Sequence, residues 1–150
     1  MKDNRFKTTL LAALICLILV DIQACRTDIS PQAIAYGKDQ CTYCRMTISD
    51  ARFGSQLVTQ KGRAYNFDDV HCMLAYIQEG NIKREEVAAF YLPDFGTNEL
   101  KPAEELFYLQ SEALGSPMQG NIAAFIKQSD RDEMLNEIGG TPLTWEELWK

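Results

Sequence analysis

Residues 53–80 of the chain read FGSQLVTQKGRAYNFDDVHCMLAYIQEG. Two runs of strand-forming residues, 53–60 and 63–67, flank a Lys-Gly turn, and this pattern predicts a β-hairpin. Asp68 follows as the predicted N-cap of a helix over 69–79 that ends before a glycine. Apolar residues recur in this helix at the spacing of one buried stripe, which comprises Val70, Met73, Leu74 and Ile77. The stretch therefore predicts a hairpin with a helix packed against it.

The same order of elements returns in the rest of the chain. The elements predicted after the helix are strands over 87–92, 105–110 and 121–126, a helix over 129–138 capped by Ser129, and a short strand over 141–145. Strand–strand–helix–strand, repeated once, indicates an α+β fold. We expect two small ββαβ-type modules packed together, the first over 40–93 and the second over 94–150.

The first 24 residues have the pattern of a signal peptide. Three basic residues precede an apolar run over 10–20. A helix of that length rises only about 16 Å, too little for a hydrocarbon core of about 30 Å, so a secretory signal is expected rather than a membrane span. The sequence Ile22-Gln-Ala-Cys25 resembles a bacterial lipoprotein cleavage box, which would make Cys25 the lipidated first residue. The alternative is an ordinary cut after Ala24 that leaves a free thiol.

The polar residues 25–39 are then expected to form a tether between the lipid and the folded part. Two or more acyl chains hold a protein stably on a membrane surface. We therefore expect a location in the cell envelope, facing the periplasm. The formal net charge of −6 makes a nucleic-acid partner improbable, because phosphate binding depends on clustered Lys and Arg.

Cysteine usage points to metal or redox chemistry. With Cys16 in the predicted signal and Cys25 lipidated, three cysteines remain: Cys41, Cys44 and Cys72. An odd number cannot form a closed set of disulfides, and a leftover thiol in an oxidising compartment favours a functional role. Met46 adds a thioether within six residues of Cys41. Sulfur donors at this density are typical of sites for soft ions such as Cu(I).

Two other interpretations of the cysteines remain open. Cys41 and Cys44 could be a redox pair, but that chemistry requires a helix N-terminus, and the β-branched residues after Cys44 disfavour one. Cys41, Cys44 and Cys72 could instead bind structural zinc together with His71. His71 and Cys72 are adjacent on the predicted helix and diverge by about 100°, which makes chelation of one ion awkward.

The remaining sulfur residues divide into core and candidate ligands. Met73 and Met134 follow the apolar pattern of their helices and are predicted core residues. Cys72 lies off the apolar stripe, in the first helical turn, where the helix dipole favours a thiolate. His71 is either solvated, a ligand, or the acceptor of a thiol proton. Met118 lies in a loop between turn formers, where it either docks into a hollow or faces a ligand.

Several stretches in this order resemble the NosL family, and together they cover nearly all of the expected mature chain. They are CTYCRMTISD at 41–50, FGSQ at 53–56, Lys61-Gly62, NFDD at 66–69, Cys72-Met73, SPM at 116–118, AAF at 123–125 and Gly139-Gly140. The resemblance implies a lipid-anchored copper-binding accessory protein of nitrous oxide reductase that works with an ABC-type transporter complex. It also implies the fold of two ββαβ modules.

The resemblance further implies the Cu(I) ligands. They are Cys44, in the Cys-x-Met motif, and Met118, with Met46 or Cys41 as further candidates and Cys72 and His71 as possible additions. We expect a copper chaperone that is not an enzyme and that delivers Cu(I) by ligand exchange. The alternatives are a membrane-anchored thiol–disulfide reductant that uses Cys41 and Cys44, or a zinc-stapled binding module.

Overall fold

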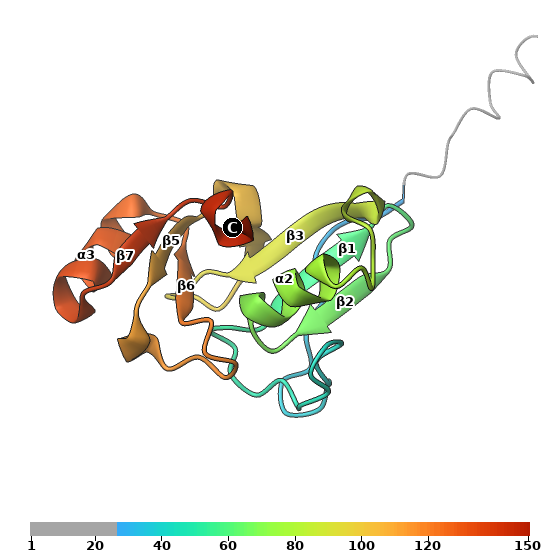
Figure 1. Cartoon of the computed structure of the whole chain (residues 1–150), viewed down its shortest axis with the longest axis horizontal. Coiled ribbons are helices and arrows are strands. Elements are labelled where there is room, and N and C mark those ends of the chain that lie inside the picture. The colour runs from blue at the N-terminus through green and yellow to red at the C-terminus, as the bar shows by residue number, and fades with distance from the viewer. Residues whose placement is uncertain (1–26) are drawn as a thin grey trace, which may run out of the picture.

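A computed structural model of the chain describes residues 27–150 (Figure 1). The predicted signal peptide over 1–24, with Cys16, and the predicted lipidation site Cys25 lie outside the described residues. Within the described part, no helix is both long enough and apolar enough to cross a membrane.

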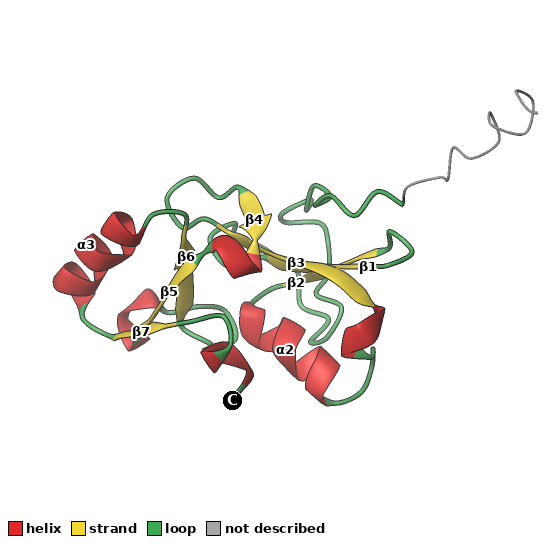
Figure 2. Ribbon diagram, turned by 90° about the horizontal axis from the view of Figure 1, so that it is seen from above, coloured by secondary structure: helices red, strands yellow, loops and turns green. Residues whose placement is uncertain are grey.

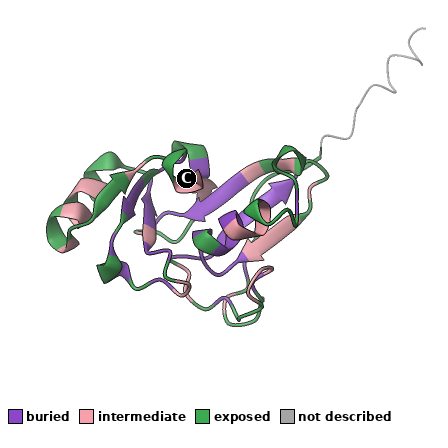
Figure 3. Cartoon of the chain, viewed as in Figure 1, coloured by how far each residue is buried: buried purple, intermediate pink, exposed green. Residues whose placement is uncertain are grey.

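The first sheet is antiparallel and has the strand order β2-β1-β3-β4. Its strands are β1 (Ser55–Thr59), β2 (Ala64–Phe67), β3 (Val87–Pro93) and β4 (Leu100–Pro102). Helix α2 (Val70–Gln78) packs against β1 and β2, as Figure 2 shows from above. Every residue of the central strand β1 is buried, which Figure 3 shows in purple.

The second sheet repeats the arrangement of the first. It has the order β6-β5-β7, again antiparallel, with strands β5 (Phe107–Gln110), β6 (Ile122–Phe125) and β7 (Thr141–Leu143). Helix α3 (Gln128–Ile138) packs against β5 and β6. In both sheets the first strand is central, the second pairs on one side, and the strand after the helix pairs on the other. The predicted α+β fold of two ββαβ units is therefore confirmed.

Apart from shifts of one or two residues at the ends of strands, the structure differs from the predicted elements in three places. Helix α2 is capped by Asp69, not Asp68, because Asp69 has an extended backbone and its Oδ1 accepts the N–H of His71 at 2.9 Å. Helix α3 begins at Gln128, after Lys127, and no side chain caps it. Strand β4 was not predicted. It falls in the stretch assigned to the second module but pairs with β3 of the first sheet, and the division of the chain at 93/94 otherwise stays a prediction.

The two sheets meet where β3 ends. Asp94 forms an isolated parallel bridge with Ala124 of β6, and the N–H of Phe95 donates to the Ala124 carbonyl at 2.8 Å. Four short 3-10 turns complete the fold, at Arg84–Glu86, Ala103–Glu105, Glu112–Leu114 and Glu147–Trp149.

One core cluster extends across both sheets, because it contains Phe90 of β3 and Tyr108 of β5.

The predicted apolar stripe of α2 lies in this core. Val70, Met73 and Leu74 are buried, and Ile77 is partly buried against them. Met134 of α3 is also partly buried, but against a smaller second cluster around Leu109 and Phe125. The prediction of both methionines as packing residues is confirmed.

Part of the expected tether lies against the first sheet. Ile34 is buried, and the N–H of Gln32 donates to Oε1 of Gln56 at 2.8 Å. The hydroxyl of Tyr91 in β3 donates to the carbonyl of Ile29 at 2.8 Å. Residues from Ile29 onward therefore belong to the folded unit, because Gln56 and Tyr91 supply hydrogen bonds that a free tether would not make.

Candidate metal centre

The sulfur motif lies in a closed loop over 40–47. Gln40 and Thr47 pair as an isolated antiparallel bridge, and the N–H of Cys41 donates to the Met46 carbonyl at 2.8 Å. Arg45 adopts a left-handed backbone, with φ of 66°, which lets the chain reverse inside the loop. The N–H of Thr42 donates to the Asn66 carbonyl of β2 at 2.8 Å. This last bond holds the loop beside the strand that leads into α2.

The loop brings three thiols together. The sulfur atoms of Cys41, Cys44 and Cys72 all lie within 4.8 Å of one another, and the three cysteines are free thiols. We call these three residues the thiol cluster. Cys41 and Cys72 are fully buried, whereas Cys44 is half-buried.

The position of Cys72 corrects one step of the sequence reasoning. Helical periodicity places it off the apolar stripe and so predicts no burial in the core. In the structure Cys72 is buried within the main core cluster together with Cys41. The reason is that the 40–47 loop covers the side of α2 that periodicity alone assigns to solvent.

The three thiols differ in acidity because their surroundings differ. A hydrogen bond from the Cys72 thiol, supported by the backbone N–H groups of Asp68, Cys44 and Tyr43, lowers the pKa of Cys41 from 9.0 to about 5 against the opposing effect of burial. The same contact with Cys41, together with burial, raises the pKa of Cys72. Burial raises the pKa of Cys44. In the metal-free cluster Cys41 is therefore the thiol that ionises most readily.

This donor set fits a soft metal ion. Three thiolates that bind one ion at the usual metal–sulfur distance of about 2.3 Å lie about 4 Å apart. The sulfur atoms of the thiol cluster are within 4.8 Å of one another, so only a small contraction would complete such a site. Thiolates and thioethers select Cu(I) and zinc over ions that prefer oxygen ligands.

The acidity of Cys41 gives a first testable prediction. In the metal-free, reduced protein, the ultraviolet absorbance of one thiolate is expected to disappear as the pH falls through about 5. In the folded protein the pKa of Cys41 lies below 9.0, the value for an ordinary thiol. Ionisation of Cys41 therefore stabilises the folded state fully above a pH of about 9, and this stabilisation is lost as the pH falls to about 5. Cys41→Ser should abolish this titration and Cys44→Ser should retain it. An unchanged titration in Cys41→Ser would assign the thiolate to another residue.

The other predicted ligands occupy different positions around the cluster. Met46 is 54% exposed, at the outer side of the loop. His71 is exposed and lies outside the group of side chains that could share one ion with the thiol cluster. Met118 is partly buried and packs against the core cluster that contains Cys41 and Cys72. The structure thus brings the three cysteines together and leaves His71 apart.

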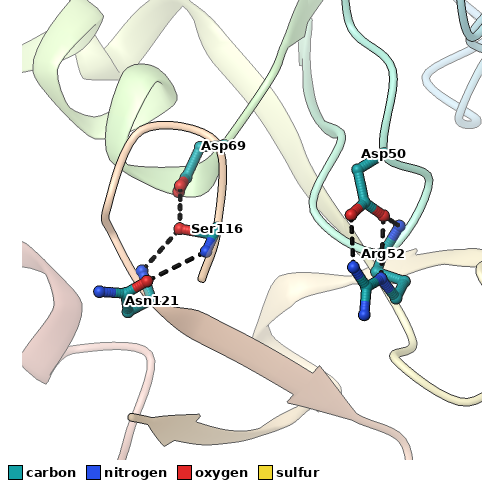
Figure 4. Close-up of polar contacts among 5 residues, drawn as sticks. All are labelled: Asp50, Arg52, Asp69, Ser116 and Asn121. Carbon is teal, nitrogen blue, oxygen red and sulfur yellow. Dashed lines mark hydrogen bonds and ion pairs between the residues drawn. The ribbon is translucent and has the colours of Figure 1, made fainter. Parts of the chain in front are cut away.

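The loop that carries Met118 is held at the N-terminus of α2, as Figure 4 shows. The hydroxyl of Ser116 donates to Oδ2 of Asp69 at 2.5 Å, and the same oxygen accepts the N–H groups of Met118 at 3.4 Å and Gly120 at 3.3 Å. The N–H of Asn121 donates to the Ser116 hydroxyl at 2.7 Å. Helix α2 also carries Cys72, one turn after Asp69, so the two candidate halves of the site share this helix.

A second polar contact in Figure 4 fixes the chain that leaves the sulfur loop. Arg52 forms an ion pair with Asp50 at 2.6 Å, and its guanidinium lies over the rings of Phe53 and Phe95. The pair lowers the pKa of Asp50. This contact anchors the segment between the thiol cluster and β1.

Sequence reasoning missed the role of Asp69. The sequence pattern predicted helix α2, but it placed the cap at Asp68, one residue too early. The contacts with Ser116, Met118 and Gly120 join residues about fifty positions apart, and local spacing contains no signal for them.

The fold and the site together define a class: a small α+β protein of two ββαβ units with a largely buried three-thiol site suited to a soft metal. A family model described as NosL matches residues 32–150. The chain belongs to the NosL family.

A solved structure supports the fold. The chain is similar to the crystal structure of the copper chaperone NosL from Shewanella denitrificans, with a TM-score of 0.68 and 17% sequence identity over 80% of this chain and 96% of that chain. At this identity the likeness concerns the fold. No curated protein matches the chain.

Proposed function

We propose that this protein is a Cu(I) carrier of the cell envelope that delivers copper for assembly of the copper centre of nitrous oxide reductase. The observation that carries the proposal is the thiol cluster, in which three sulfur atoms lie within 4.8 Å of one another. Membership of the NosL family supports it, as does the similarity to a protein described as a copper chaperone. In this proposal the protein is a carrier and not an enzyme.

The geometry suits a carrier because its sulfur donors become more exposed toward one side. Cys41 and Cys72 are fully buried, Cys44 is half-buried, and Met46 is 54% exposed. Copper bound to the inner thiols would be reached by a partner only from the side of Cys44 and Met46. Ligands can then be exchanged one at a time, without oxidation or reduction of the ion. Loading would release the protons of the cluster thiols that bind the ion, because the thiolate is the ligand.

The proposal is tested by titrating the reduced protein with Cu(I) without oxygen, against a colorimetric Cu(I) chelator. One ion is expected per chain, and Cys44→Ser and Met118→Leu should each weaken binding at least about 10-fold. If the wild-type protein fails to compete with the chelator, it is not a Cu(I) carrier. If both variants bind as the wild type does, Cys44 and Met118 are not ligands.

The partner and the anchor belong to the proposal as well. The lipid on Cys25 would hold the protein at the periplasmic side of a membrane, near the ABC-type transporter complex. Copper-loaded protein mixed with copper-free nitrous oxide reductase and membranes that contain the transporter should transfer copper to the reductase. Retention of all copper on the carrier would reject this destination and leave Cu(I) binding intact.

The two alternatives are less well supported by the geometry. The low pKa of Cys41 suits thiol–disulfide exchange, but an attacking thiol must be accessible and Cys41 is fully buried. A structural zinc site of three cysteines needs a fourth ligand, and His71 is exposed outside the cluster. Stoichiometric zinc in the purified protein, with unfolding on chelation, would favour the second alternative.

A further inference from the structure

The side chain of Asp69 connects the two parts of the protein that supply sulfur donors. One carboxylate oxygen, Oδ1, caps α2 by accepting the N–H of His71. The other, Oδ2, accepts the Ser116 hydroxyl and the N–H groups of Met118 and Gly120. Asp69 is 1% exposed, so this oxygen has no solvent to replace those three donors. The carboxylate is therefore shared between the helix that carries Cys72 and the loop that carries Met118.

The loop has a shape that requires such a holding contact. Gln119 and Asn121 both adopt left-handed backbone conformations, with φ of 59° and 53°. L-residues reach this region at a cost, so the surrounding contacts must stabilise it. Ser116 and Asn121 are buried and bond to each other twice, through the Asn121 N–H and the Ser116 N–H. These contacts fix the loop internally, and Asp69 attaches it to the N-terminus of α2.

Gly120 lies directly against the same carboxylate. A Cβ at this position would be 2.6 Å from Oδ1 of Asp69 and 3.0 Å from Cβ of His71. Only glycine allows the loop to approach the helix N-terminus so closely. The Met118 loop is thus seated on α2 one turn before Cys72.

We propose that Asp69 is the positioning residue of the copper site, which holds the Met118 thioether in place beside the thiol cluster. The inference rests on the proposed function as a Cu(I) carrier. Asp69 itself is not a ligand in this account. Its role is to keep Met118, in the loop between β5 and β6, within reach of an ion held by the thiol cluster. A flexible loop would do this poorly.

Asp69→Asn separates this role from that of the helix cap. Asparagine caps helices as well as aspartate does, so the bond to His71 can persist. In the amide orientation that keeps this cap, Nδ2 takes the place of Oδ2 and cannot accept the three donors of the loop. In the metal-free protein, hydrogen exchange of the Met118 and Gly120 amides should accelerate at least about 10-fold. The Cu(I) affinity should fall by the same factor as in Met118→Leu, and Asp69→Asn combined with Met118→Leu should bind as Met118→Leu alone.

Asp94→Asn is the matched control. Asp94 is also a buried aspartate with three donors, because it accepts the N–H of Ile126 at 2.9 Å and both the N–H and the hydroxyl of Thr97. It too connects the two sheets, but its hydrogen bonds do not reach the Met118 loop. We expect Asp94→Asn to leave both the exchange of the Met118 amide and the Cu(I) affinity near the wild-type values.

The outcomes distinguish the two proposals. Unchanged amide exchange in Asp69→Asn overturns the inference without involving copper. The inference is also overturned if Asp69→Asn binds Cu(I) with wild-type affinity while Met118→Leu binds it more weakly. It is overturned as well if the double variant binds Cu(I) more weakly than Met118→Leu by the full effect of Asp69→Asn alone. A wild-type protein that fails to bind Cu(I) overturns the proposed function, whatever the exchange of the loop amides shows.

Discussion

Replacing Cys41 with serine is expected to lower the Cu(I) affinity of the protein more than about 100-fold. Loss of a residue that only supports a ligand typically lowers metal affinity about 10- to 100-fold, and removal of a ligand should lower it more. The sulfur atom of Cys41 lies within 4.8 Å of both other sulfur atoms, and the pKa of this thiol is lowered by its hydrogen bond with Cys72. A serine hydroxyl is similar in shape but is a poor ligand for a soft ion. The measurement is the same anaerobic competition titration with a colorimetric chelator.

The Cu(I) affinity of Cys72→Ser will show how many of the three thiols bind the ion. If Cu(I) is held by the whole thiol cluster, Cys72→Ser should weaken binding as Cys41→Ser does. If the ligands are only Cys44 and Met118, as the family resemblance implies, both variants should bind nearly as the wild type does. Met73→Leu is the control, since Met73 is a fully buried sulfur residue beside Cys72 on α2 and this exchange conserves volume. If Met73→Leu also lowers the Cu(I) affinity, the losses in the cysteine variants result from damaged packing.

The elements that local patterns determine could be predicted from the sequence. The β1–β2 hairpin and α2 follow from a turn, a cap and an apolar stripe that lie within thirty residues, and they form where predicted. The repeated strand order follows from the same kind of signal. Strand β4 could not be predicted in this way, since three residues that end in Pro102 form a strand only because β3 is available as a partner.

The sequence could predict which cysteines are candidates for the site, but not how distant elements place them. The number of cysteines and the density of sulfur along the chain are enough to single out Cys41, Cys44 and Cys72. The burial of Cys72 depends on a loop about thirty residues earlier in the chain. The seating of Met118 depends on Asp69, about fifty residues away. Helical periodicity describes one element at a time, so contacts between distant elements lie beyond it.

Trp145→Ala is expected to lower the free energy of unfolding by about 3–5 kcal/mol, the usual loss for truncating a buried aromatic residue. Trp145 is 5% exposed, and its ring lies 5.3 Å from that of Phe90 in the first sheet and 6.1 Å from that of Tyr108 in the second. The indole is therefore shared by both ββαβ units. Its removal leaves a cavity at the place where the two sheets are joined.

Chemical denaturation of the reduced, metal-free protein measures this loss. The wild type should unfold in one transition seen equally by far-ultraviolet circular dichroism and tryptophan fluorescence, because the sheets share one core. Phe107→Ala is the control, since Phe107 lies on β5 but is 38% exposed, and it should cost less than about 1 kcal/mol. Two separate wild-type transitions, or a Trp145→Ala midpoint equal to that of the control, would show that the units are stable independently. Joint unfolding would mean that the cysteines of the first ββαβ unit and Met118 of the second keep their spacing only while this shared core is intact.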